Sequence, residues 1–306
     1  MSAPVVGRFA PSPTGPLHFG SLIAAVGSYC LARKHKGLWL LRMEDLDTPR
    51  VVPGAADDIL RTLDAFGLHW DGEIVWQSQR IDAYQSALEK LQEGGRLFAC
   101  GCSRKEVIAS APHPGEEGPV YAGTCRRGLR PGRKPRSLRL HVPEERICFT
   151  DGVYGAVQQV LSRSVGDFVL RRADGLFAYQ LAVVVDDSAS GVTQVVRGAD
   201  LLSSTPRQIY LHACLGTASP TYYHLPLAVD SQGEKISKRH GPISVGHESL
   251  DCGLLQEVLR FLGQSVPKEL ALAPAREVLR WAECCFDQQR IPANLDGLYV
   301  KVEKFV

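Results

Sequence analysis

The loop RFAPSPTGPLHFGSL, residues 8–22, has the residue types of a phosphate-binding site. It contains three prolines, two glycines and a single histidine, His18, and it leads into a run with the apolar spacing of a buried helix. A helix N-terminus attracts anions, because its first N–H groups are unpaired and the positive end of its dipole lies there. His18 would donate a ring N–H to a phosphate oxygen, and Gly20 would let a nucleotide approach the backbone closely. A tight proline-rich turn with a surface histidine is the alternative interpretation.

A second loop, GEKISKRHG at residues 233–241, places Lys235 and Lys238 between glycines. Charge runs are often only solvated surface, but a doubly wound sheet would bring two such loops to the same strand ends. The common nucleotide motifs do not describe the first loop. Ser21 and Leu22 stand where a Walker A motif requires lysine and serine or threonine, and no GxGxxG precedes the helix. The two loops together predict an ATP site of another kind.

A third group of residues has the chemistry of a metal site. Cys100 and Cys102 are followed, after 18 residues, by Tyr121 and then Cys125. Three thiolates suit a structural zinc ion, whereas a phenolate is an uncommon fourth ligand, so His113 is a possible substitute for Tyr121. Buried free thiols are the alternative interpretation.

The remaining composition excludes several classes of protein. Nine cysteines are an odd number, and Cys30, Cys214 and Cys252 lie in apolar helical patterns, which argues against a disulfide framework. No apolar run approaches the ~18 to 20 residues of a membrane span, and no hydrophobic leader begins the chain. We therefore expect a cytoplasmic protein without membrane contact.

A local basic stretch is a candidate contact for nucleic acid. The net charge is only +2, so such a partner would have to be met locally. Seven basic and no acidic residues lie in this stretch: Arg126, Arg127, Arg130, Arg133, Lys134, Arg136 and Arg139. By itself the stretch indicates either RNA phosphate contacts or a solubilising surface.

The order of the predicted elements is typical of a doubly wound α/β sheet. Apolar runs predict strands over 4–9, 38–43, 181–187 and 192–198. They predict helices over 20–33 and 54–66, a third helix that begins at an N-cap at Ser78, and a fourth that begins at 205–206 and ends at Gly216. Residues 100–155 are rich in Gly, Pro, Arg and Cys and predict an insert. After a loop at 230–247 the chain is expected to be mostly helical.

Several of these stretches resemble a known family. His18-Phe19-Gly20-Ser21 and Lys235-Ile236-Ser237-Lys238-Arg239 resemble the two signatures of class I aminoacyl-tRNA synthetases. RFAPSPTGPLHFG, LLRMEDLDTPR (40–50), YQLAVVVDD (179–187) and VVRGADLL (195–202) resemble the glutamyl branch. The chain ends 66 residues after His240, which is short for a glutamyl-tRNA synthetase. In its length, its cysteine pattern and the sequence HFGSL of its first signature, the chain resembles the glutamyl-queuosine tRNA(Asp) synthetases, a family of shortened paralogues.

The resemblance implies the architecture. It implies a class I synthetase Rossmann-like doubly wound parallel sheet with a zinc-containing insert and a helical C-terminal stem-contact region, without an anticodon-binding domain. The expected units are the first half of the catalytic domain at 1–97, an acceptor-type insert at 98–176, the second half at 177–228, and the KISKR loop with the stem-contact helices at 229–306.

The resemblance also implies the reaction. It is ATP-dependent activation of L-glutamate to glutamyl-adenylate, with Mg²⁺ accompanying ATP, and transfer to the queuosine base of tRNA(Asp), which the stretch Arg126–Arg139 would contact. A monomer is expected. The alternatives are a shortened synthetase that charges tRNA(Glu) at its 3′ end and a non-catalytic RNA-binding paralogue.

The implied site residues come from both halves of the chain. Catalysis is assigned to Lys238 and His18, ATP binding to His18, Gly20, Ser21, Lys235 and Lys238, glutamate binding to Arg8, Ser12, Glu44, Tyr179 and Arg197, and one structural zinc to Cys100, Cys102, Tyr121 and Cys125. An alternative for Arg8 is a capping or ion-pair role with Asp45 or Asp47. Asp186 and Asp187, at the end of an expected strand, are predicted to be structural rather than a metal pair.

Overall fold

The computed structural model describes residues 4–115, 118–229, 252–293 and 299–301. The predicted cationic loop with Lys235 and Lys238 lies outside these described residues. Among the helices that are described, none is long and apolar enough to cross a bilayer.

A parallel sheet forms the centre of the molecule. The strands β3 (Val75–Trp76), β2 (Leu38–Met43) and β1 (Val6–Phe9) pair in parallel, as do β9 (Gln194–Gly198) and β10 (Thr221–Leu225). The strands β1 and β9 are neighbours, because the Thr193 N–H donates to the Val6 carbonyl at 2.9 Å. The chain therefore leaves β1 toward β2 on one side, while β9 leads to β10 on the other. Such a switch point opens a crevice at the carboxyl ends of the two central strands.

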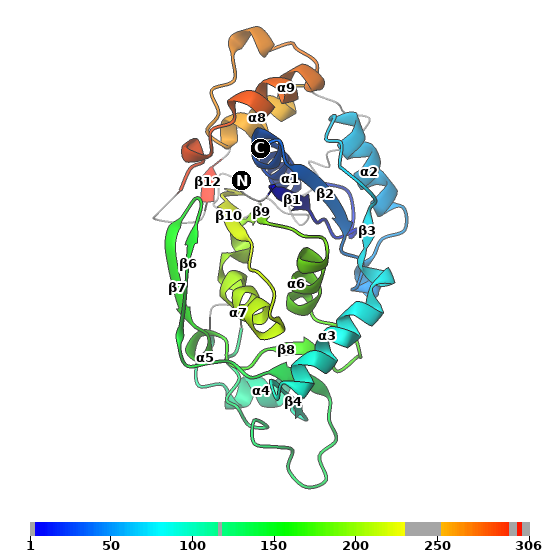
Figure 1. Ribbon diagram of the computed structural model, residues 1–306, viewed down its shortest axis with the longest axis vertical. Coiled ribbons are helices and arrows are strands. Elements are labelled where there is room, and N and C mark those ends of the chain that lie inside the picture. The colour runs from blue at the N-terminus through cyan, green and yellow to red at the C-terminus, as the bar shows by residue number, and fades with distance from the viewer. Residues whose placement is uncertain (1–3, 116–117, 230–251, 294–298, 302–306) are drawn as a thin grey trace.

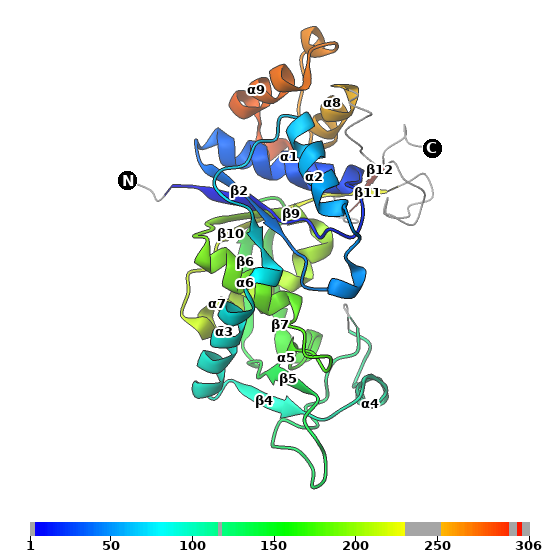
Figure 2. The same cartoon turned by 90° about the vertical axis from the view of Figure 1, so that its right-hand side faces the viewer.

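Helices cover both faces of this sheet (Figure 2). On one face lie α1 (Phe19–Lys34), α8 (Cys252–Phe261) and α9 (Ala275–Cys285), with α2 (Ala55–Ala65) beside α1, and their apolar side chains share one core with Trp39 and Leu41. On the other face lie α6 (Tyr179–Ala189) and α7 (Thr205–Leu215), which share a second core with α3 (Ile81–Glu93). The expected doubly wound parallel α/β architecture is confirmed.

One predicted strand was wrong. Residues 181–187 lie within the helix α6, in which Leu181, Ala182, Val183 and Val184 are all buried. A continuous apolar run suits a helix enclosed on most sides as well as a buried strand, so periodicity could not separate the two. The predicted N-cap at Ser78 was also wrong: α3 begins at Ile81, and Ser78 donates from its N–H and hydroxyl to Asp45 at 2.8 and 2.6 Å.

Glycines end two elements for different reasons. The helix α7 stops at Gly216, whose φ of +68° is left-handed, as the sequence predicted. Gly37 lets the turn between α1 and β2 pass the N-terminal strand, since a Cβ there would lie 2.3 Å from the Val5 carbonyl oxygen. Within 252–293 most residues lie in helices, and the strand β12 (Tyr299–Lys301) pairs with β11 (Leu227–Val229).

The middle of the chain forms the end of the molecule opposite α8 and α9 (Figure 1). The strands β4 (Leu97–Cys100), β5 (Ser137–Leu140) and β8 (Val169–Arg171) make an antiparallel sheet, with α4 (Arg104–Ser110) next to it in sequence. The hairpin of β6 (Arg146–Asp151) and β7 (Gly155–Val160) extends from β10 to α5 (Leu161–Ser164).

Candidate active site and metal centre

A cavity of about 550 Å³, here called the active-site cavity, opens at the carboxyl ends of β1 and β9. Its walls come from the loop 8–21, from Glu44 after β2, from Tyr179 at the start of α6, and from residues 196–201. Eight residues assigned from the sequence line it together: Arg8, Ser12, His18, Gly20, Ser21, Glu44, Tyr179 and Arg197. The switch point of the sheet thus brings together side chains from four separate segments of the chain.

His18 caps the helix α1. Its backbone is extended, and its Nδ1 accepts a hydrogen bond from the Ser21 N–H at 3.2 Å. In the neutral ring, the proton is therefore on Nε2, which is a donor suited to a phosphate oxygen. The first turn of α1 has no acidic residue, so nothing there opposes an anion at the positive end of the helix dipole.

Arg8 and Glu44 are joined by a chain of buried ion pairs. The Arg8 Nε donates to Asp187 at 3.2 Å, Arg42 donates from Nη1 to the same carboxylate at 2.6 Å, and the Arg42 Nη2 donates to Glu44 at 3.2 Å. Arg8 therefore pairs with Asp187 rather than with Asp45 or Asp47. The chain alternates two guanidiniums with two carboxyl groups, which fixes the two cavity-lining groups in position.

The pKa values of the two carboxyls in this chain move in opposite directions. Burial raises the pKa of Asp187, but Arg42 and Arg8 more than offset it and hold that pKa at about 2. Burial raises the pKa of Glu44 and outweighs Arg42 and Arg8 there. A cation arriving beside Glu44 would favour its ionised form.

Asp186, the neighbour of Asp187, lies 3.9 Å from the Nε of the same Arg42 and also binds a second set of groups. It accepts hydrogen bonds from the Arg80 Nε, the Gln77 amide and the Tyr84 hydroxyl at 2.5, 2.8 and 2.7 Å. Both carboxylates are thus paired with arginines, and they tie α6 to β1, β2 and α3.

Arg197 is buried and held by neutral groups. It donates to the Gln208 side chain, the Thr205 hydroxyl, the Leu201 carbonyl and the His224 Nε2. Within the described residues, no carboxylate lies at ion-pair distance from Arg197. Buried charges are normally compensated, so this guanidinium is suited to receive a carboxylate from a ligand.

His224 connects Arg197 to the hairpin. Because the Arg197 Nε donates to the His224 Nε2 at 3.1 Å, the ring proton is on Nδ1, which donates to Asp151 at 2.6 Å. Burial lowers the pKa of His224, so the neutral ring that this bridge needs is favoured. Sequence reasoning missed His224 and Asp151, which belong to no recognisable local motif, and it assigned no role to Arg42, although Arg42 lies in the stretch 40–50.

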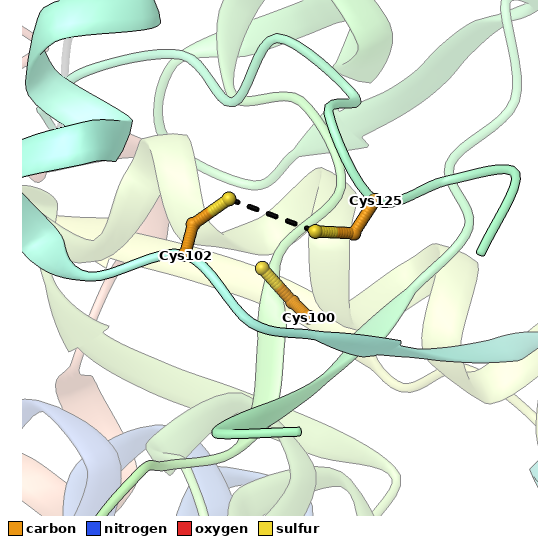
Figure 3. Close-up of side chains that lie close together, drawn as sticks. All are labelled: Cys100, Cys102 and Cys125. Carbon is orange, nitrogen blue, oxygen red and sulfur yellow. Dashed lines mark hydrogen bonds between the residues drawn. The ribbon is translucent and has the colours of Figure 1, made fainter. Parts of the chain in front are cut away.

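Three cysteines of the insert form a compact group (Figure 3). The sulfur atoms of Cys100, Cys102 and Cys125 lie within 4.8 Å of one another, and Cys102 and Cys125 are 3.6 Å apart. Tetrahedral zinc with Zn–S bonds of about 2.3 Å separates two sulfurs by about 3.8 Å. The donor set and its spacing therefore fit a zinc ion.

Tyr121 occupies the fourth side of this group. Its hydroxyl lies 3.4 Å from the Cys100 sulfur and 3.9 Å from the Cys102 sulfur, and it accepts a hydrogen bond from the Cys125 N–H at 2.8 Å. Burial raises the pKa of the phenol, and hydrogen bonds with Cys100 and Cys125 raise it further. His113 is exposed and is not part of the group.

The basic stretch is only partly available to a partner. Arg133 pairs with Glu106, Arg126 lies 3.3 Å from Asp167, and the Arg139 guanidinium lies 3.9 Å from the centre of the Tyr121 ring. The four other basic residues, Arg127, Arg130, Lys134 and Arg136, are exposed. Three of the seven basic residues of the stretch therefore have partners within the chain, and its contact with RNA stays a prediction.

The amino-acid sequence is similar to those of known tRNA synthetases. A model of the family described as tRNA synthetases class I (E and Q), catalytic domain, matches residues 4–284. A glutamyl-Q tRNA(Asp) synthetase from Geobacter sulfurreducens is 59% identical over 295 residues, which are 94% of each chain. A protein of the same name from Dechloromonas aromatica is 58% identical over 92% of this chain and 94% of its own length.

A solved structure is similar as well. A glutamate tRNA ligase from Elizabethkingia meningosepticum, solved in complex with its amino acid, has a TM-score of 0.77 and 26% identity over 94% of this chain. The match covers 66% of that ligase, so this chain spans about two thirds of its length.

Proposed function

We propose a function from the family to which the chain belongs: the class I tRNA synthetases of the glutamyl and glutaminyl group and, within them, the glutamyl-Q tRNA(Asp) synthetases. In this proposal the protein activates L-glutamate with ATP and transfers it to queuosine in the anticodon of tRNA(Asp). The observation that carries this proposal is the identity of 58–59% with proteins of that name over more than nine-tenths of the chain. The active-site cavity supplies the matching chemistry, because it combines an anion site at a helix start with a buried carboxylate and two arginines.

Glutamate has one ammonium and two carboxylates to bind. Glu44 takes the ammonium, whose charge favours the ionised carboxylate. Arg197, which has no acidic partner among the described residues, takes one ligand carboxylate, and Arg8 contributes a second guanidinium. Ser12 and Tyr179, which line the same cavity, supply hydroxyl groups for further hydrogen bonds. Glutamate recognition is therefore a matching of three ligand charges to three side chains.

ATP binds at the start of α1 in this proposal. The His18 Nε2–H, the Gly20 N–H and the Ser21 hydroxyl hold its phosphates, and the ATP carries its own Mg²⁺. A glutamate carboxylate oxygen attacks the α-phosphorus, the bond to the bridging oxygen breaks, and pyrophosphate leaves. Lys235 and Lys238, outside the described residues, complete the binding of the phosphates, with Lys238 stabilising the charge that develops on pyrophosphate.

The second step joins glutamate to the RNA. A hydroxyl oxygen of the acceptor nucleoside attacks the carbonyl carbon of glutamyl-adenylate, an ester forms, and AMP and a proton are released. Positioning supplies most of this catalysis, since both reactants are held in adjoining places.

In this proposal the insert at 98–176 provides the contact surface for RNA. We propose that Cys100, Cys102 and Cys125, with the Tyr121 oxygen as fourth ligand, hold one structural zinc ion that fixes the loop before the basic stretch. The exposed residues Arg127, Arg130, Lys134 and Arg136 are the phosphate contacts of that stretch. A monomeric, cytoplasmic enzyme is part of the same proposal.

The test is transfer of labelled glutamate to three RNAs. They are queuosine-containing tRNA(Asp), queuosine-free tRNA(Asp) and tRNA(Glu). We expect label only on the first, and we expect it to survive removal of the 3′ end. Label on the 3′ end of tRNA(Glu) would instead establish a shortened conventional synthetase, and the absence of glutamate-dependent ATP–pyrophosphate exchange would establish a non-catalytic paralogue.

A further inference from the structure

Two further cavities lie between the active-site cavity and the insert, and each cavity shares one lining residue with the next. The first, here called the acceptor cavity, has about 600 Å³ and lies between β7 and residues 199–206. It shares Asp200 with the active-site cavity. The second, here called the distal cavity, has about 700 Å³ and shares Arg163 with the acceptor cavity. The series follows the hairpin, which extends from the central sheet to α5 and the insert (Figure 1).

The acceptor cavity is polar where it approaches the active site. Asp200, Ser203 and Gln159 line it. The Gln159 Oε1 is buried and has no hydrogen-bond partner in the described part of the chain. A buried carbonyl oxygen of this kind is normally satisfied, so it is suited to accept a hydrogen bond from a hydroxyl or amino group of a ligand. A volume of several hundred cubic ångströms is ample for one nucleoside.

Two arginines that line the distal cavity are available to a ligand. Arg163 stands at the boundary with the acceptor cavity, and Arg127 stands near the cysteine group. Both are exposed, and among the described residues neither side chain makes a hydrogen bond or an ion pair. Of the acidic residues that line the cavity, Asp167 is already engaged by Arg126, which leaves Glu144 as the other carboxylate.

We propose that these cavities form one binding track for a single-stranded segment of RNA. The acceptor nucleoside lies in the acceptor cavity with a hydroxyl directed past Asp200 to the glutamyl-adenylate, and Gln159 accepts a hydrogen bond from it. Arg163 and Arg127 bind phosphates of the flanking nucleotides, which is the usual way for a basic groove to follow a single strand. This inference rests on the proposed function, because it needs an RNA acceptor.

The test compares Arg163→Ala, the double variant with Arg127→Ala, and Gln159→Met with the unaltered protein. The readouts are binding of queuosine-containing tRNA(Asp) at several salt concentrations and transfer of labelled glutamate to it. Each lost phosphate contact should weaken binding about fourfold at 0.15 M salt and reduce the salt slope by about 0.7. Gln159→Met should slow transfer by about fivefold, as expected for one lost hydrogen bond.

A matched control is Arg61→Ala on α2. Arg61 is also an exposed arginine, with one contact to Asp58 at 3.8 Å, and it lines none of the three cavities. Its variant should bind and transfer as the unaltered protein does. ATP–pyrophosphate exchange with glutamate alone shows that the adenylate site of each variant is intact and separates loss of folding from loss of RNA contact.

The outcomes distinguish the two proposals. If the unaltered protein shows no exchange or charges only a 3′ end, the proposed function fails. If it transfers to queuosine while the Arg163 and double variants keep its binding, salt slope and transfer rate, the RNA track is wrong and the proposed function stands.

Discussion

Replacing Asp187 by asparagine removes the negative charge that Arg8 and Arg42 share. Asparagine has the same shape, so the change leaves no cavity. It leaves two guanidiniums 3.2 and 2.6 Å from a neutral amide, in a site where the aspartate is 4% exposed. Breaking a buried ion pair in this way costs about 3–5 kcal/mol. Because Arg8 and Glu44 lose their shared support, the KM for glutamate should rise more than the KM for ATP.

The contribution of the Asp187 ion pairs to the free energy of unfolding should depend on pH. The pKa of Asp187 is about 2 in the folded protein, against about 3.9 in an unfolded chain. A depressed pKa contributes stability above the unfolded value and loses it as the pH falls toward the folded value. About 2 kcal/mol of this stability should therefore be present above pH 4 and disappear between pH 4 and pH 2. The Asp187→Asn variant should not show this component.

The assay is urea unfolding at pH 7 and at several lower pH values, together with ATP–pyrophosphate exchange at varied glutamate. Asp174→Asn is the matched control, because Asp174 pairs with Arg172 at 2.7 Å at a site where both side chains are nearly half exposed. That variant should change the free energy of unfolding by less than about 1 kcal/mol. A loss below 1 kcal/mol for Asp187→Asn, with an unchanged KM for glutamate, would refute the argument that this ion-pair chain positions the site.

Three further predictions concern other parts of the molecule. His224→Leu removes the acceptor that orients Arg197, so the KM for glutamate in ATP–pyrophosphate exchange should rise about tenfold while the KM for ATP stays unchanged. His224→Gln should recover part of this loss. Equal changes in both KM values would contradict a positioning role for His224. Metal analysis should give about one zinc per chain. Cys102→Ser or a strong chelator should reduce the transfer of glutamate to RNA more than ATP–pyrophosphate exchange, because the cysteine group lies in the insert and not in the active-site cavity. Lys238→Ala should lower the exchange rate by about 10² to 10³, and a fall of less than tenfold would assign the pyrophosphate charge to another residue.

Local patterns along the chain determined the elements that depend on near neighbours. The short apolar run at 38–43 is a strand, as predicted. The glycine at 216 ends its helix, because a left-handed cap is a property of a few adjacent residues. The order of these elements also determined the doubly wound sheet, whose switch point places the active-site loop. The spacing of Cys100, Cys102 and Cys125 was enough to predict the sulfur group, since short loops limit where such side chains can be.

Tertiary structure alone decided which charges meet. Arg8 and Asp187 are 179 residues apart, and Asp151 and His224 are 73 apart, so no local spacing could pair them. It also decided that 181–187 is a helix, because a run of apolar residues is compatible with any element that is enclosed on all sides. In the basic stretch, packing assigned three of the seven cations to partners within the insert. The physical reason is common to all of these cases: the energy of a charge or an apolar side chain depends on what folding places beside it, and that is a property of the whole chain.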